Sequence, residues 1–99
     1  MTEPPAITRA RERYGLLLEM DDLRAMVRLI RSGRRIYLRP SDDGCEIHAI
    51  SYAGIWLPVV WSTASEWIVT ILPPTHLPLK RHRRRIARRS PRDFREVAI

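Results

Sequence analysis

Three polar residues on one predicted strand have side chains that could do acid–base chemistry. Glu46, His48 and Tyr52 stand at even spacings within residues 45–52, so they share one face of a strand. Metal-independent cleavage of RNA at a 2′-hydroxyl needs a general base, a general acid and cations near the phosphorane, and Glu, His, Tyr and Arg can fill these roles. The alternative is an exposed strand face that carries ordinary polar residues. The pattern therefore has two interpretations, a catalytic row around His48 or a solvated face.

Other kinds of reactive site are absent from the sequence. A single cysteine, Cys45, excludes an internal disulfide, and three scattered histidines do not form a Cys/His set for zinc. The four glycines lie in predicted turns and form no phosphate-binding loop. Asp21–Asp22 and Asp42–Asp43 are explained as helix-cap and turn residues. The sequence therefore predicts no metal site and no cofactor.

The net charge lies at one end of the chain. Residues 1–74 contain nine basic and nine acidic side chains, whereas residues 75–99 contain nine basic and two acidic ones, so the second segment holds the whole net charge of +7. Its densest part holds seven basic residues, Lys80, Arg81, Arg83, Arg84, Arg85, Arg88 and Arg89. Such a run repels itself unless a polyanion neutralises it, and the phosphate backbone is the usual cellular polyanion. Nucleic acid is the predicted partner, and the alternatives are an acidic protein or no partner.

Arginines also gather on two predicted helices. Arg9 and Arg13 share a face of the first helix at i, i+4, and Arg24, Arg28 and Arg31 lie on the polar side of the second. Arg34 and Arg35 follow the second helix and belong to the same group. The planar guanidinium suits bidentate contacts to phosphate. We expect the second set to add nucleic-acid contacts, and a solvated helix face is the alternative.

The two helices are predicted from periodicity and end signals. Residues 6–14 follow two prolines and stop at Gly15, which is typical of a short helix. The second helix has its cap at Asp21 or Asp22 and stops at Ser32–Gly33. Its apolar residues recur at i, i+3, i+4 and i+7, namely Leu23, Met26, Val27 and Ile30.

The rest of the first 74 residues alternates with a period of two. We expect four strands joined by short turns, over residues 34–39, 45–52, 55–62 and 67–72. Pro58 predicts that the third strand is an edge strand or has a bulge. The fold class is therefore α+β, with two N-terminal helices packed on a four-stranded antiparallel meander. Residues 1–74 form the globular domain, and residues 75–99 form a basic tail that ends in a short helix starting at Ser90–Pro91.

Two segments resemble the RelE-like small ribonuclease superfamily. These are the arginine-rich first helix up to Gly15 and the closing strand that runs from Trp67 through Thr70 to Pro74. The likeness covers residues 6–74 and is nearest to short phage and prophage proteins. It implies a partner that is RNA more readily than DNA, and Arg9, Arg13 and Thr70 match the family's site residues by position. Together with His48 of the polar row, these residues would surround the scissile phosphate. The family's histidine near the first helix has no counterpart, and Thr8 stands in that neighbourhood.

Two hypotheses follow from these features. The first is a phage- or prophage-type RNA-binding module on a RelE-like fold, with metal-independent ribonuclease activity as an option. The second is a non-catalytic phage protein, a virion component or an inhibitor of a host machine. It would dock by its neutral domain and use the tail on nucleic acid or an acidic groove. Because the sequence has no signal peptide and no apolar run long enough for a membrane span, we expect it in the bacterial cytoplasm or a virion, with no membrane partner. No oligomeric state is predicted.

Overall fold

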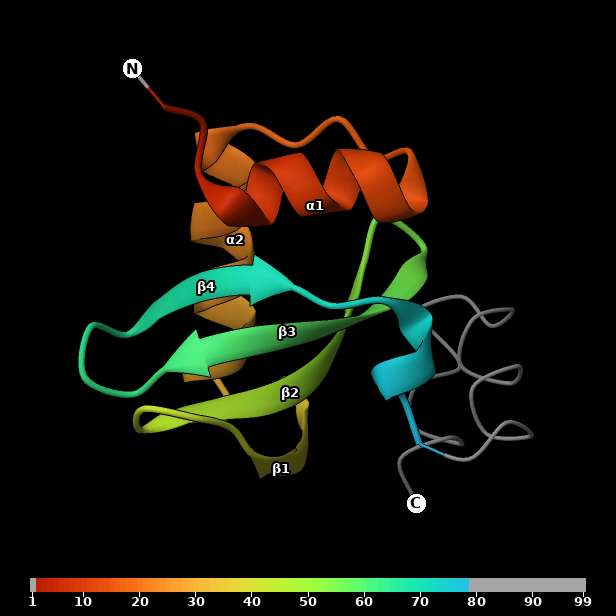
Figure 1. The fold of residues 1–99 in the computed structure, drawn as a ribbon. Coiled ribbons are helices and arrows are strands. Elements are labelled where there is room, and N and C mark those ends of the chain that lie inside the picture. Colours follow the sequence, from red (N-terminus) through yellow and green to blue (C-terminus); the bar gives the residue numbers. More distant parts are fainter. Residues whose placement is uncertain (1, 79–99) are drawn as a thin grey trace.

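The computed structural model describes residues 2–78, which form two helices followed by a four-stranded antiparallel sheet. The elements are α1 (Pro5–Tyr14), α2 (Met20–Arg31), β1 (Ile36–Pro40), β2 (Cys45–Tyr52), β3 (Ile55–Ser62), β4 (Trp67–Ile71) and a 3-10 turn, η1 (Pro74–His76). Neighbouring strands in the sheet follow the order of the chain, β1-β2-β3-β4 (Figure 1). The α+β meander predicted from the sequence is confirmed.

The two helices differ in how well the sequence predicted their ends. α1 stops at Gly15, which takes the left-handed conformation with φ +67°, as expected for a C-terminal glycine. α2 begins earlier than predicted, with Glu19 as its N-cap. The predicted cap at Asp21 or Asp22 is wrong, because the Asp22 carboxylate lies in the first turn and accepts the Glu19 backbone N–H at 2.8 Å.

Pro58 lies in an inner strand and away from both bulges, so the predicted edge or bulge position is wrong. Its carbonyl accepts the backbone N–H of Leu72 at 2.8 Å, just past the end of β4. Because the N–H and C=O of one strand residue point to the same side, the missing N–H would have faced the Leu72 carbonyl. The Tyr14 hydroxyl donates to that carbonyl at 2.6 Å. A side chain of α1 therefore takes the place of the bond that proline cannot make.

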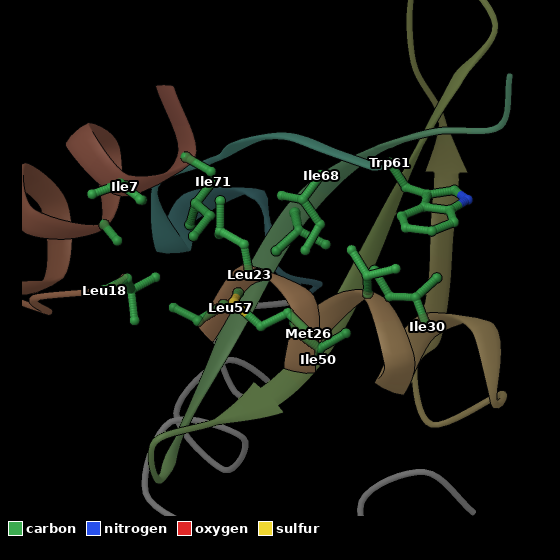
Figure 2. Packing of buried hydrophobic residues seen from close by; sticks show 14 residues of the cluster. Ile7, Leu18, Leu23, Met26, Ile30, Ile50, Leu57, Trp61, Ile68 and Ile71 are labelled. Atoms are coloured by element: carbon green, nitrogen blue, oxygen red, sulfur yellow. The ribbon is translucent and has the colours of Figure 1, made fainter. Parts of the chain in front are cut away.

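Both helices cover the same face of the sheet. Figure 1 shows α1 along the β4 edge and α2 crossing behind the strands. The four periodic residues of α2 are all buried, which confirms their prediction as core. Figure 2 shows Leu23 and Met26 among Ile50, Leu57 and Ile68 of the sheet. This apolar layer holds α2 in a fixed position over β2.

A smaller apolar cluster lies on the opposite face of the sheet. It contains Ala49, Trp56 and Leu77, with Ile36 and Leu38 packed against it. Leu77 follows η1, which lies in front of the sheet in Figure 1. Packing therefore continues a few residues past the end of the domain that the sequence predicted. The basic segment, residues 80–89, and the short helix predicted beyond it lie outside the described residues.

Two strands also depart slightly from their predicted ends. β1 begins at Ile36, two residues later than predicted, and β4 ends at Ile71, one residue earlier. The register shifts between Tyr37 and Arg39 of β1 and across Val69 of β4. These bulges change which side chains of the edge strands share a face with the inner strands.

Candidate functional site

The row of polar residues on β2 lies under the helices. His48 pairs with Val59 and Ile50 pairs with Leu57, and both β3 residues belong to the core beneath α1 and α2. Since paired residues on neighbouring strands share a face, Glu46, His48, Ile50 and Tyr52 all point toward the helices. The predicted shared face is confirmed. The alternative of an exposed face is wrong, because His48 is only 2% exposed and Ile50 is fully buried.

At one end of this row, Tyr52 connects β2 to the start of α2. Its hydroxyl donates to Oδ1 of Asp22 at 2.6 Å. Burial raises the pKa of Tyr52 to about 12, and the bond to Asp22 contributes to the shift. The same hydrogen bond lowers the pKa of Asp22, with help from the Glu19 backbone N–H. Each polar group is satisfied by the other, so we call this the closed end of the row.

At the other end, the space between α2 and the sheet opens into a polar groove with a volume of about 280 Å³. Its walls come from the last turn of α2, the segment before β1, the start of β2, and the end of β3 with the turn that follows it. The lining residues are Ile30, Arg31, Arg35, Glu46, His48, Trp61, Thr63 and Glu66. Figure 2 shows Ile30 and Trp61 next to each other at this end of the core, where they give the groove an apolar part.

His48 holds the carboxylate of Glu46 inside the polar groove. Its Nε2 lies 3.0 Å from Oε1 of Glu46, and its ring meets the Tyr37 ring edge-to-face with 5.5 Å between centroids. The other ring nitrogen, Nδ1, is buried and has no hydrogen-bond partner among residues 2–78. In the neutral ring, the tautomer with its proton on Nε2 donates to Glu46 and leaves Nδ1 as an unused acceptor. An unsatisfied buried polar atom costs about 1–3 kcal/mol, so this position is not optimised for stability alone.

Arg35 brings an unpaired cation to the same groove. Its Nε is buried without a partner, and its guanidinium makes no ion pair or hydrogen bond with any other residue of the described chain. Arg31 is instead held by Glu66, with 3.1 Å between Nε and Oε1, in an exposed pair at the rim. Within residues 2–78, the Glu46 side chain is held by His48 alone. Among residues 2–78, the groove therefore contains an unpaired guanidinium, Arg35, and a carboxylate, Glu46, that His48 alone holds.

Two of the four predicted catalytic residues lie on opposite faces of the sheet. Thr70 pairs with Val60, whose neighbours Val59 and Trp61 point into the core under the helices. Because neighbouring strand residues alternate between faces, Thr70 points away from the helices and away from His48. The prediction that one scissile phosphate contacts all four residues is therefore corrected. The bulge at Val69 explains the error, since it shifts the alternation of β4 by one residue.

The other two predicted catalytic residues are on α1 and already have partners. Arg9 is exposed and donates to Glu12 at 2.6 Å, one turn away on the same helix. Arg13 donates to the carbonyl of Ile71 at 2.6 Å, so it ties α1 to the end of β4. Neither residue lines the polar groove. Their positions indicate a structural role at the edge of the sheet.

The predicted arginine set on α2 divides into paired and unpaired members. Arg24 is bonded to Asp21 at 2.7 Å, and Arg31 is bonded to Glu66. Arg28 has no acidic partner in the described part of the chain and borders a second groove together with Arg34. The second groove has a volume of about 470 Å³ and is lined by Ala25, Arg28, Leu29, Ser32, Arg34, Ser51, Tyr52 and Ala53. The two grooves flank the C-terminal part of α2, and within the part of the chain that the structure describes Arg28, Arg34 and Arg35 line them without an acidic partner.

The sequence did not predict that the lining residues of the polar groove come together. Arg35 and Glu66 come from segments about 30 positions apart, and only the sheet brings them together. One local signal was present, because Arg34 and Arg35 directly follow the glycine that ends α2. Trp61 gave no signal of its own, since an aromatic residue in an inner strand is ordinary core.

The remaining predictions concern other parts of the chain. The seven basic residues between positions 80 and 89 that the sequence assigns to nucleic acid lie outside the described residues. Among residues 2–78, no helix has the length and apolar character needed to cross a membrane, and no three His, Cys, Asp or Glu side chains gather as a metal ion would require. Comparison with protein-family models, with curated proteins and with solved structures found no match.

Proposed function

We propose that this chain is a small nucleic-acid-binding protein of a phage, a prophage or their bacterial host, with RNA favoured over DNA as its partner. The observation that carries the proposal is the separation of charge along the chain. A neutral folded domain is followed by a segment that holds the whole net charge of +7. The resemblance of residues 6–74 to RelE-like proteins, which act on RNA, supports the same class of partner.

The folded domain shows why the basic segment differs from ordinary surface charge. Arg9, Arg11 and Arg24 of the domain each lie within 2.8 Å of a carboxylate oxygen. Residues 80–89 contain no acidic side chain at all, so their charges have no local counterpart in the sequence. Phosphates along a nucleic acid would supply that counterpart and release bound counterions, which gives strong, salt-dependent binding.

We propose that the protein binds RNA without cleaving it. Thr70 and His48 face opposite sides of the sheet, and Arg13 is engaged by the Ile71 carbonyl. The free nitrogen of His48 is buried, so a 2′-hydroxyl has no direct path to it. We expect labelled RNA to stay intact when it is incubated with the protein in EDTA. Cleavage under these conditions would instead support the hypothesis of a metal-independent ribonuclease.

The salt dependence of RNA binding tests the proposal. If the seven cations of residues 80–89 each contact a phosphate, the affinity for a single-stranded RNA 12-mer falls with a log–log salt slope of about −5. In the full chain, replacing Arg83, Arg84 and Arg85 by glutamine makes the slope less steep by about 2. A matched control replaces Arg9, Arg11 and Arg24 by glutamine and leaves the slope unchanged, because these arginines already have acidic partners.

Fluorescence anisotropy between 50 and 300 mM salt provides the measurement, with the same sequence tested as RNA and as DNA. An equal slope in wild type and tail variant contradicts the assignment of the basic segment. Lack of binding to both nucleic acids contradicts the proposal as a whole. It would favour the alternative in which the segment binds an acidic protein.

A further inference from the structure

We propose that the polar groove binds a single unstacked guanine of single-stranded RNA, and that Glu46 reads the base. This inference rests on the proposed function and adds the part of the RNA that the folded domain recognises. Basic residues of the tail contact phosphates, which carry no sequence information, so any base preference must come from another surface. Of the two described grooves, the polar groove is the one whose lining includes carboxylates, so it offers a charged acceptor, Glu46, beside the unpaired guanidinium of Arg35.

The acceptor has the chemistry that one base edge requires. A carboxylate only accepts hydrogen bonds when it is ionised, and it accepts best from two parallel donors. Guanine presents such a pair, N1–H and the N2 amino group, on its Watson–Crick edge. Adenine and cytosine each present a donor next to an acceptor on that edge. One oxygen of the carboxylate would then face the acceptor atom of the base, and their lone pairs would repel each other. Glu46 therefore favours guanine.

His48 explains why Glu46 stays in place to do this. The histidine is 2% exposed and holds Oε1 of Glu46 at 3.0 Å, whereas the Glu46 side chain itself is 37% exposed. Oε1 accepts from the buried ring and keeps a second lone pair, and Oε2 has no protein donor within the described chain, so both oxygens can accept from a guanine. The unsatisfied Nδ1 shows that the site keeps a polar residue where an apolar one would pack without that cost. His48 is a positioning residue for Glu46.

The rest of the groove suits a base and the backbone next to it. Ile30 and Trp61 give it an apolar part, and the Arg31 guanidinium, fixed by Glu66, lies at the rim, where arginine planes stack on unpaired bases. Arg35 carries the unpaired charge that a flanking phosphate would take. A volume of about 280 Å³ lies at the small end for ligand pockets, which fits one base better than a longer stretch of chain.

Oligonucleotides of equal charge separate this inference from the proposed function. The full chain is titrated with A12, with A12 carrying one central guanine, and with A12 carrying one central inosine, which lacks the N2 amino group. Since the number of phosphates is constant, the contribution of the tail is the same for all three. We expect the guanine oligonucleotide to bind about tenfold more tightly than A12. The inosine oligonucleotide binds with intermediate affinity.

Three variants assign the preference to the groove. Glu46→Gln reduces the guanine preference to less than about twofold. The matched control Glu12→Gln makes the same charge change on α1, outside the groove, and keeps the preference. His48→Leu weakens the preference because Glu46 loses its hold, whereas His48→Gln, whose amide can still donate, restores part of it. Equal urea midpoints for the variants show that the fold is unchanged.

Each outcome is informative. Salt-dependent RNA binding with equal affinity for all three oligonucleotides overturns the guanine site and leaves the proposed function intact. A guanine preference that survives in Glu46→Gln also overturns it. No RNA binding at all overturns the proposed function together with this inference.

Discussion

The polar row of β2 has two ends that differ in their packing against α2. Tyr52 contacts the first turn of α2, whereas Glu46 faces the last turn of the same helix. Tyr52 is bonded to Asp22 at 2.6 Å, so the closed end leaves its hydroxyl satisfied. At the Glu46 end, which we call the open end, His48 Nδ1 and Arg35 Nε are buried and have no hydrogen-bond partner within residues 2–78, and both residues line the polar groove. Both ends carry polar groups from the same face of the same strand. Both ends also border a groove. The difference between them is that Tyr52 is paired under α2, whereas His48 and Arg35 each keep a buried nitrogen without a partner in the described chain.

The first test removes the apolar residue that separates the two ends. Ile50 is fully buried between Tyr52 and His48 on the core face of β2. Ile50→Ala deletes buried methyl groups and leaves a cavity, so we expect the free energy of unfolding to fall by about 2–5 kcal/mol. Urea denaturation followed by tryptophan fluorescence measures it. A loss below about 1 kcal/mol would mean that α2 does not pack on β2 as described.

The second test opens the closed end. Tyr52→Phe removes the bond to Asp22, and we expect a loss of about 1 kcal/mol, at the low side of the range for charged partners because the carboxylate is partly exposed. Tyr37→Phe serves as a control, since Tyr37 is 49% exposed and its hydroxyl makes no hydrogen bond in the described chain. If Tyr52→Phe and Tyr37→Phe had equal urea midpoints, the hydrogen bond between Tyr52 and Asp22 would make no contribution to stability.

The Tyr52–Asp22 pair also predicts how stability depends on pH. The raised pKa of Tyr52 means that its contribution is complete below about pH 10 and is lost as the pH rises through about 12. The lowered pKa of Asp22 means that its contribution is present above its ordinary pKa near 3.8 and is lost as the pH falls through the lowered value. Urea midpoints measured across this range should fall at both extremes in the wild type. Tyr52→Phe should reduce both limbs, and the alkaline limb that remains includes the contribution of Tyr14, whose pKa is also raised by burial.

The smallest change in stability is expected at the open end. His48→Leu removes an unsatisfied buried nitrogen and leaves Glu46 in contact with solvent, so the two effects offset each other within about 1 kcal/mol. Urea denaturation at neutral pH measures the difference. If His48→Leu lost more than about 2 kcal/mol, the ring would be a structural element like Tyr52, and the contrast between the two ends would disappear.

Local pattern predicted the elements of this fold, and long-range contacts decided the details. The i, i+3, i+4 spacing from Leu23 to Ile30 identified α2 and its buried face, because periodicity depends only on neighbouring residues. The cap of α2 was predicted wrongly, because an aspartate serves equally well at the cap and in the first turn. Pro58 was misplaced because its missing bond is replaced by Tyr14, which lies 44 positions earlier in the chain.

The candidate site was predictable only in part. The alternation of Glu46, His48 and Tyr52 showed that they share a face, yet the sequence could not show that helices cover that face. Thr70 could not be assigned to a face, because the bulge at Val69 shifts the alternation of β4 without a glycine or proline to mark it. Arg35 and Glu66 meet at the groove only because the hairpins fold back on each other.

The contacts between α1 and the end of β4 have a further consequence for how this protein behaves at high concentration. An edge strand with free carbonyls can add a strand from another molecule, which begins aggregation. Here Arg13 occupies the outward carbonyl of Ile71, and α1 lies along that edge. The opposite edge, β1, is short and carries a bulge at Leu38 and a proline at its end. Both borders of the sheet are therefore poor templates for a second chain, so we expect strand addition between copies to be disfavoured at high concentration.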